Sequence, residues 1–252
     1  MTIDAYSPPR DFVSKVRRRL IQQRAARPAE FAFEEPILSV TFDDFPASAA
    51  EAGVRILDRH GARGTFYASA GLEGAIGPCG VNFSGRDIAR LAAHGHEIGC
   101  HSLQHEDCAR RDIFSNLEDL ARNRDRLLAM GAPPPRSHAY PYGETSSELK
   151  DNLPPRFMSA RGILPGLNAG RGDLAQLHAY PLFGEESAQH LRDVLRLGAK
   201  RKAWVIVFTH DVSDAPSPYG AKASDLDELL RAAHALGFVI LPVTAALQRN
   251  LA

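Results

Sequence analysis

The amino-acid sequence predicts an α/β fold in which about seven parallel strands close into a barrel or near-barrel. Short, largely apolar segments alternate along the chain with segments of helical periodicity. This alternation is typical of βαβ units whose parallel strands are buried on both faces. Roughly seven such units in one domain fit a barrel better than an open doubly wound sheet. No GxGxxG follows the first strand, which argues against a dinucleotide-binding fold.

The predicted strands share an apolar, β-branched or aromatic composition. They cover residues 37–42, 64–69, 96–100, 137–141, 156–160, 203–209 and 238–243. Helices are predicted between the strands, at residues 47–60, 85–95, 111–131, 186–199 and 224–236. Ser84 can cap the second helix, and Gly131 can end the third.

Length and composition describe an ordinary globular protein. The chain has 252 residues, of which 44% are hydrophobic, so it can bury a substantial core. Thirty basic and thirty acidic residues cancel, which gives no indication of nucleic-acid binding. Cys79, Cys100 and Cys108 form no CxxC pair, so neither a disulfide framework nor a Cys-rich zinc site is indicated. No apolar run approaches the ~20 residues of a membrane span, and the N-terminus lacks a secretory signal core, so we expect a cytoplasmic protein.

A basic segment, residues 1–35, precedes the main domain of residues 36–252. Within it Phe12, Val16 and Leu20 recur every four residues among several arginines. We expect a short amphipathic helix that packs on the domain and keeps its charges in water. Binding to a membrane surface or to an acidic partner is the alternative.

Four of the predicted strands end in polar residues. In a parallel barrel the chemistry collects at the C-terminal ends of the strands, because the following loops converge there. The four strand exits carry Asp43-Asp44, His101 with His105, Tyr142-Gly143, and His210-Asp211.

The two histidines at one exit have the spacing of metal ligands. His101 and His105 stand four residues apart, so on a helical turn both imidazoles can reach one ion. An HxxxH pair alone is equally consistent with a surface or core pair, and the order is not HExxH, since Glu106 follows the second histidine. A carboxylate from the Asp43-Asp44 exit would complete a two-His, one-carboxylate site with positions open for water and substrate. The alternative for the two aspartates is a solvated loop or a helix cap.

Four segments in this order also carry a family resemblance. They are TFDDF (41–45), GHEIGCHSLQH (95–105), AYPYG (139–143) and VIVFTH (205–210). From about residue 36 to 245 the chain resembles the polysaccharide deacetylase family (NodB homology domain, carbohydrate esterase family 4). The resemblance implies a distorted (β/α) barrel with about seven strands. It also implies a hydrolase that removes acetyl groups from N-acetylated sugars with one divalent metal, most often zinc.

Position by position, the resemblance implies two sets of site residues. The metal ligands would be Asp44, His101 and His105. The catalytic groups would be Asp43 as general base, the backbone N–H of Tyr142 as a donor to the oxyanion, and His210 as general acid. The acid that orients His210 stays open between Asp211 and Asp214.

Two positions depart from the family pattern. Phe45 stands where the family often has glycine, which changes backbone freedom and bulk beside the metal. Ala139 stands where the family often has an arginine that pairs with the catalytic base. Arg161 and Arg171 are the candidates to reach the site instead.

The substrate is less clearly indicated. Loop aromatics that could contact a sugar are Tyr140, Tyr142, Tyr180, Phe183 and Tyr219. This modest set favours a sugar intermediate or short oligosaccharide over bulk cell wall. Two alternatives remain: a hydrolase of another small amide or C–N bond, and a non-catalytic domain that keeps the metal and binds carbohydrate. The sequence gives no indication of the oligomeric state.

Overall fold

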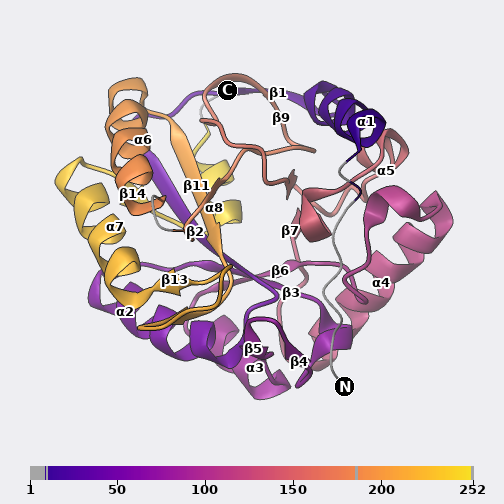
Figure 1. The fold of residues 1–252 in the computed structure, drawn as a ribbon, viewed down its shortest axis with the longest axis horizontal. Coiled ribbons are helices and arrows are strands. Elements are labelled where there is room, and N and C mark those ends of the chain that lie inside the picture. The colour runs from indigo at the N-terminus through magenta and orange to yellow at the C-terminus, as the bar shows by residue number, and fades with distance from the viewer. Residues whose placement is uncertain (1–8, 10, 185–186, 251–252) are drawn as a thin grey trace.

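A curled parallel sheet forms the centre of the molecule (Figure 1). The computed structural model describes residues 9, 11–184 and 187–250. The sheet has the order β10-β11-β2-β3-β6-β7-β8, and β14 also pairs with β2; every pair in it is parallel. Its strands are β2 (Ile37–Asp43), β3 (Thr65–Ala68), β6 (Glu97–Cys100), β7 (Ser137–Ala139), β8 (Ser159–Arg161), β10 (Tyr180–Pro181), β11 (Trp204–Thr209) and β14 (Val239–Ile240). The predicted distorted (β/α) barrel is confirmed.

All seven predicted strands are present, although β7 and β14 are shorter than predicted, ending at Ala139 and Ile240. Strand β8 begins at Ser159 rather than at residue 156, because Phe157 lies in a turn and donates its N–H to the carbonyl of Pro154. Strand β10 was not predicted, because one of its two residues is Pro181, and proline is unfavourable in a strand.

Helices surround the sheet (Figure 1). They are α2 (Val54–Arg59), α3 (Gly85–Ala93), α4 (Ile113–Ala129), α5 (Ser147–Asp151), α6 (Ser187–Arg201), α7 (Ala223–Ala235) and α8 (Val243–Gln248). The five predicted helices are all present, although the first begins as a π-helical turn at Ala49–Gly53. The Ser84 cap of α3 is confirmed: its hydroxyl accepts the N–H of Asp87, whose carboxylate accepts the N–H of Ser84. None of the helices in the described residues is long and apolar enough to cross a bilayer.

Short strand pairs lie outside the main sheet. They are β1 (Pro28–Phe31) with β9 (Gly170–Asp173), β4 (Ile76–Gly77) with β5 (Gly80–Val81), and β12 (Val212–Ser213) with β13 (Ala221–Lys222). The antiparallel pairing of β1 with β9 connects the basic N-terminal segment to the rest of the fold.

Helix α1 (Phe12–Gln23) lies in that segment and differs from the expectation in its orientation. No residue of α1 is buried, and Phe12 and Leu20 are 81% and 64% exposed. Polar groups make its contacts instead: Arg18 pairs with Glu144, and the ammonium of Lys150 donates to the carbonyl of Ile21 at 3.0 Å. The apolar stripe that was expected to pack on the domain therefore faces outward.

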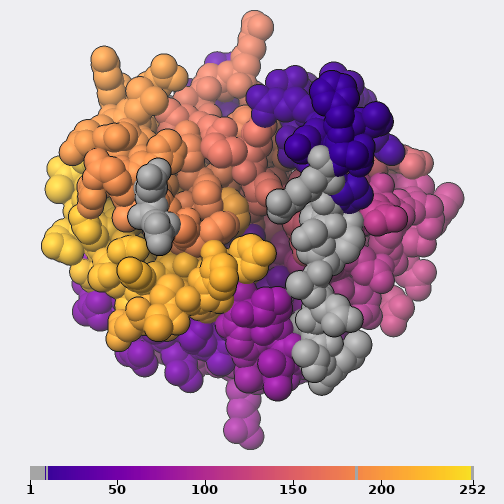
Figure 2. Space-filling view, viewed as in Figure 1, coloured from indigo at the N-terminus to yellow at the C-terminus, as the bar shows by residue number. Residues whose placement is uncertain are grey.

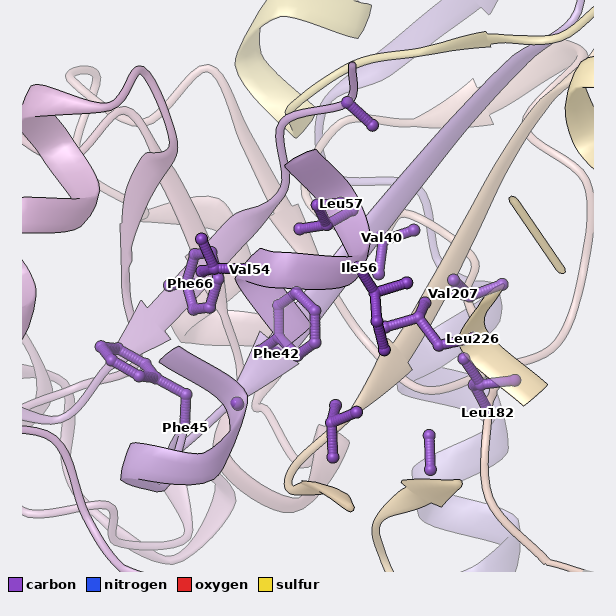
Figure 3. Packing of buried hydrophobic residues seen from close by; sticks show 14 of the residues in the cluster. Val40, Phe42, Phe45, Val54, Ile56, Leu57, Phe66, Leu182, Val207 and Leu226 are labelled. Atoms are coloured by element: carbon purple, nitrogen blue, oxygen red, sulfur yellow. The ribbon is translucent and has the colours of Figure 1, made fainter. Parts of the chain in front are cut away.

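The largest apolar cluster joins the sheet to its helices (Figure 3). Phe42 of β2 stacks on Phe66 of β3 with ring centroids 4.6 Å apart. The Phe45 ring meets Phe66 edge to face at 5.2 Å and stacks on Phe83 at 4.6 Å. This aromatic packing fixes the end of β2, where the chain enters the candidate site.

Candidate metal and catalytic site

Strand register brings the predicted strand exits together. In the β11–β2 pair Thr209 lies opposite Phe42, so His210 and Asp43 occupy the next positions of adjacent strands. The N–H of His101 donates to the carbonyl of Ala68 at 3.1 Å, which holds the exit of β6 beside that of β3. The carboxyl ends of the central strands therefore share one edge, as expected for a parallel sheet.

Asp44, His101 and His105 form the cluster in which a metal ion could lie. Their ligand atoms all fall within 4.8 Å of one another. The Nε2 atoms of His101 and His105 lie 3.9 and 3.2 Å from the Asp44 carboxylate oxygens. The structure thus brings together the three residues that the resemblance assigns to the metal.

The helical turn assumed for the two histidines was wrong. Residues 101–107 form an irregular loop, in which Ser102 and His105 have φ of 62° and 53°. Two bonds hold this loop: the Ser102 hydroxyl accepts the N–H of His105 at 3.1 Å, and Asp119 of α4 accepts the N–H of Leu103 at 2.5 Å. Asp119 is a supporting residue that sequence reasoning missed, because it lies in a helix remote from the motifs.

Left-handed backbone conformations cluster at the site. Asp44 has φ of 51° and Tyr142 has φ of 58°, in addition to His105. Such conformations cost non-glycine residues of order 1–3 kcal/mol each and gather at functional sites. The backbone at Asp44, His105 and Tyr142 therefore places these side chains at the site at a cost to the stability of the fold.

Each histidine of the cluster is oriented through its other ring nitrogen. His101 Nδ1 lies 2.7 Å from the carbonyl oxygen of Ala139, and His105 Nδ1 lies 3.1 Å from the hydroxyl of Tyr142. With Nδ1 protonated, Nε2 offers a lone pair toward Asp44. Burial lowers the pKa of His101 well below 6.5 and that of His105 to about 4. Both rings are therefore neutral near pH 7, the form that binds metal.

Asp44 has the properties of a metal ligand. Burial raises the pKa of this carboxyl group to about 7. Its buried Oδ1 has no hydrogen-bond partner among the described residues. A divalent cation between Asp44 and the two Nε2 atoms would compensate the buried charge.

Asp43 pairs with an arginine from an unexpected strand. Arg161 of β8 donates to the Asp43 carboxylate, and both side chains are almost completely buried. Burial is the largest single influence and would raise the pKa of Asp43, but the Arg161 guanidinium, His101 and His210 together outweigh it and lower the pKa from its ordinary value of 3.8. Arg161 on β8 lies directly opposite Ala139 on β7. Ala139 is the position at which the family often has its arginine, so here the arginine comes from the neighbouring strand.

The rings of Tyr67 and Phe208 fix that guanidinium at centroid distances of 5.0 and 5.2 Å. The other candidate, Arg171, is exposed on β9 opposite Glu30. Of the two arginines considered from the sequence, only Arg161 contacts Asp43 in the described residues.

His210 is oriented by the backbone rather than by an acid. Its Nδ1 lies 3.2 Å from the carbonyl oxygen of Tyr219, so Nε2 is the nitrogen that faces away from this contact. Asp211 instead accepts the N–H of Ser217 at 2.8 Å and its hydroxyl at 2.5 Å. Neither Asp211 nor the exposed Asp214 contacts the His210 ring through a hydrogen bond in the described residues.

Two aromatic rings flank His210. Phe183 lies 6.2 Å from the His210 ring and 6.1 Å from Tyr219, which is 51% exposed. Tyr140 was wrongly counted among the loop aromatics open to a sugar: it is 1% exposed, and its hydroxyl donates to the carbonyl of Ala175. The reason is that the Tyr140 ring packs in an apolar cluster that includes Leu149 and Phe157.

Phe45 does not crowd the metal cluster. It is fully buried and its ring lies in the apolar core (Figure 3). Its φ is not among the left-handed values, so the backbone here does not require glycine.

Comparison with known proteins agrees with this arrangement. Residues 32–153 match the model of the polysaccharide deacetylase family. No curated protein matches the chain. The matched residues, the order of the motifs and the barrel agree with the resemblance to the polysaccharide deacetylase family that the sequence carries.

Solved structures share the fold at low sequence identity. A family 4 acetyl xylan esterase from Clostridium thermocellum, in complex with a cobalt ion, is 21% identical over 84% of this chain and 90% of its own, with a TM-score of 0.62. Peptidoglycan deacetylase PdaC from Bacillus subtilis is 16% identical over 86% and 92%, with a TM-score of 0.55. A mutant of a CE4 family pseudoenzyme is 15% identical over 90% and 72%, with a TM-score of 0.56.

Proposed function

We propose that this protein is a metal-dependent hydrolase that removes an acetyl group from an N-acetylated sugar or short oligosaccharide. The observation that carries the proposal is the meeting of three ligand-type side chains, Asp44, His101 and His105, with the buried Asp43–Arg161 pair. A site that only bound a cation would have no need of a second carboxylate held ionised beside it.

Zinc is the proposed metal. Two neutral imidazoles and one carboxylate form a donor set that suits Zn²⁺. The Oδ1 of Asp44, which has no hydrogen-bond partner in the part of the chain that the structure describes, supports a cation there. A bound divalent cation would polarise the acetyl carbonyl and lower the pKa of water. Asp44, His101 and His105 would hold it.

The protons are moved by the chain's own residues in this proposal. Asp43, kept ionised by Arg161, accepts the proton of the attacking water. The backbone N–H of Tyr142 donates to the oxyanion as the carbonyl becomes tetrahedral. His210, whose Nδ1 faces the Tyr219 carbonyl, donates its Nε2 proton to the departing amine.

The substrate class follows from the few aromatics near His210. Phe183 and Tyr219 offer two ring surfaces on one side of the site, enough to contact one or two sugar units. The cytoplasm is the proposed compartment, and the free thiols of Cys79, Cys100 and Cys108 suit reducing conditions.

The test is acetate release by zinc-loaded protein from a panel of N-acetylated mono- and oligosaccharides. We expect release from one length class, abolished by chelation and restored by zinc. The fold alone does not guarantee activity, since one structural relative is described as a pseudoenzyme. No acetate from any member, with one metal bound per chain, would reject the deacetylase in favour of another amide substrate or a binding role.

A further inference from the structure

Helix α1 presents an apolar stripe that the fold leaves uncovered. Phe12, Val13, Val16 and Leu20 are 81%, 73%, 43% and 64% exposed. The spacing of three and four residues places them on one face of the helix. Figure 2 shows α1 in indigo at the surface of the molecule.

The opposite face of α1 is the one attached to the protein. Its half-buried residues are Ser14, Arg18, Ile21 and Gln22, again at spacings of three and four. Arg18 pairs with Glu144, and Arg24, just beyond the helix, pairs with Asp151 through two nitrogens at 2.8 and 2.9 Å. The stripe therefore faces outward because ion pairs on the far side hold the helix in that orientation.

Basic residues flank the stripe. On a helical projection Arg19 and Lys15 follow one edge and Arg17 follows the other. All three are exposed, and none has an ion-pair partner within residues 9, 11–184 and 187–250. Glu148, at the start of α5, is the carboxylate that lies beside the stripe, in the groove it shares with α1.

We propose that α1 binds the surface of a bilayer containing anionic lipids. An exposed apolar helix face bordered by Lys and Arg is the pattern of a helix that lies in the interface plane, with its apolar side chains below the headgroups. The cations would attract the negative surface, and long side chains can reach headgroups while their stems stay apolar. This proposal does not depend on the proposed enzymatic function.

The position of α1 links the bilayer to the candidate site. Arg18 holds Glu144, two residues after Tyr142, whose hydroxyl contacts His105. Docking of α1 would therefore bring the loop that carries Tyr142 close to the headgroups.

The test is co-sedimentation of the full chain with two kinds of vesicle, phosphatidylcholine alone and an equimolar mixture with phosphatidylglycerol. We expect binding to the mixture and little to phosphatidylcholine. Leu20→Ser should weaken partitioning about tenfold by removing a buried apolar side chain. Arg17→Gln with Arg19→Gln should weaken partitioning by roughly twenty-five-fold, since each basic residue contributes about fivefold.

Ile76→Ser is the matched control. Ile76 is 56% exposed on β4, which Figure 1 places at the opposite end of the view from α1. We expect wild-type partitioning for this variant. Because all altered side chains are exposed, thermal melting should be unchanged in each protein.

Three results would overturn the proposal. They are no binding to the mixed vesicles, equal binding to both kinds of vesicle, and equal loss in Ile76→Ser and Leu20→Ser. Dimerisation abolished by Leu20→Ser, without vesicle binding, would assign the stripe to a second copy of the chain instead.

Discussion

Removal of Arg161 should affect both the stability of the protein and the ionisation of Asp43. The Arg161 side chain is fully buried, and that of Asp43 is 7% exposed. Breaking a buried pair by removal of one partner costs about 3–5 kcal/mol, because the other charge stays buried and uncompensated. We therefore expect Arg161→Ala to lower the free energy of unfolding of the metal-free protein by that amount at neutral pH.

The loss should depend on pH, with a sign set by Asp43. In the wild type the pKa of Asp43 is lowered, so the pair stabilises the protein above the unfolded pKa and the gain is lost as the pH falls through the folded value. Without Arg161, burial raises the pKa, and protonation relieves the buried charge at low pH. Urea unfolding at pH 5 and pH 8 should therefore show a larger loss at pH 8.

Catalysis supplies the second readout. If Asp43 is the base, Arg161→Ala should shift the acid limb of the kcat/KM profile to higher pH and lower the rate at pH 7 by about a hundredfold. Arg171→Ala, an exposed arginine, is the matched control and should leave both readouts unchanged. Addition of Ala139→Arg to Arg161→Ala should restore part of the stability and part of the rate. The reason is that residues 139 and 161 lie opposite each other on neighbouring strands. An unchanged acid limb together with unchanged stability would refute the reasoning.

Other predictions test the ligands and the surroundings of the site. Metal affinity, followed by calorimetry, should fall about tenfold per pH unit below 7. The reason is that the pKa of Asp44 is raised to about 7, so that a proton competes with the cation for this carboxylate. A flat affinity profile between about pH 5.5 and 7 would contradict this. Asp44→Asn should abolish metal binding yet raise the unfolding free energy of the metal-free protein at pH 8 by about 2 kcal/mol, since it removes a buried charge; a destabilised variant would count against the burial argument. Tyr219→Ala should raise KM about tenfold with kcat within a few fold, whereas an equal loss in kcat would assign the ring to chemistry. Phe45→Ala should cost about 3–4 kcal/mol in urea unfolding and still bind one metal; loss of the metal would show that Phe45 acts on the cluster.

The fold was predictable because its strands are buried on both faces. The two central strands β2 and β11 are rich in apolar and β-branched residues and are buried throughout, which leaves little ambiguity in their position. Strand β10 contains Pro181, and the isolated short helices α5 and α8 carry too few side chains to show a period. The π-helical start at Ala49–Gly53 has no signal in the sequence.

The side chains of the site were predictable as a set, but their geometry was not. Strand ends in a parallel sheet meet at one edge, so Asp44, His101 and His105 could be grouped from their positions alone. The left-handed backbone of His105 and the pairing of Arg161 with Asp43 depend on tertiary packing, through Asp119 and the rings of Tyr67 and Phe208. For α1, periodicity revealed the apolar stripe without saying which way it faces, because ion pairs on the other side decide that.

The most direct test of the proposed function combines metal content and acetate release on the same three proteins. The wild type should hold one zinc per chain and release acetate from an N-acetylated sugar. Asp43→Asn should hold the zinc and release none, and Asp44→Asn should lose both. Acetate release by Asp43→Asn at the wild-type rate would contradict the assignment of Asp43 as the base and, with it, the account of the site.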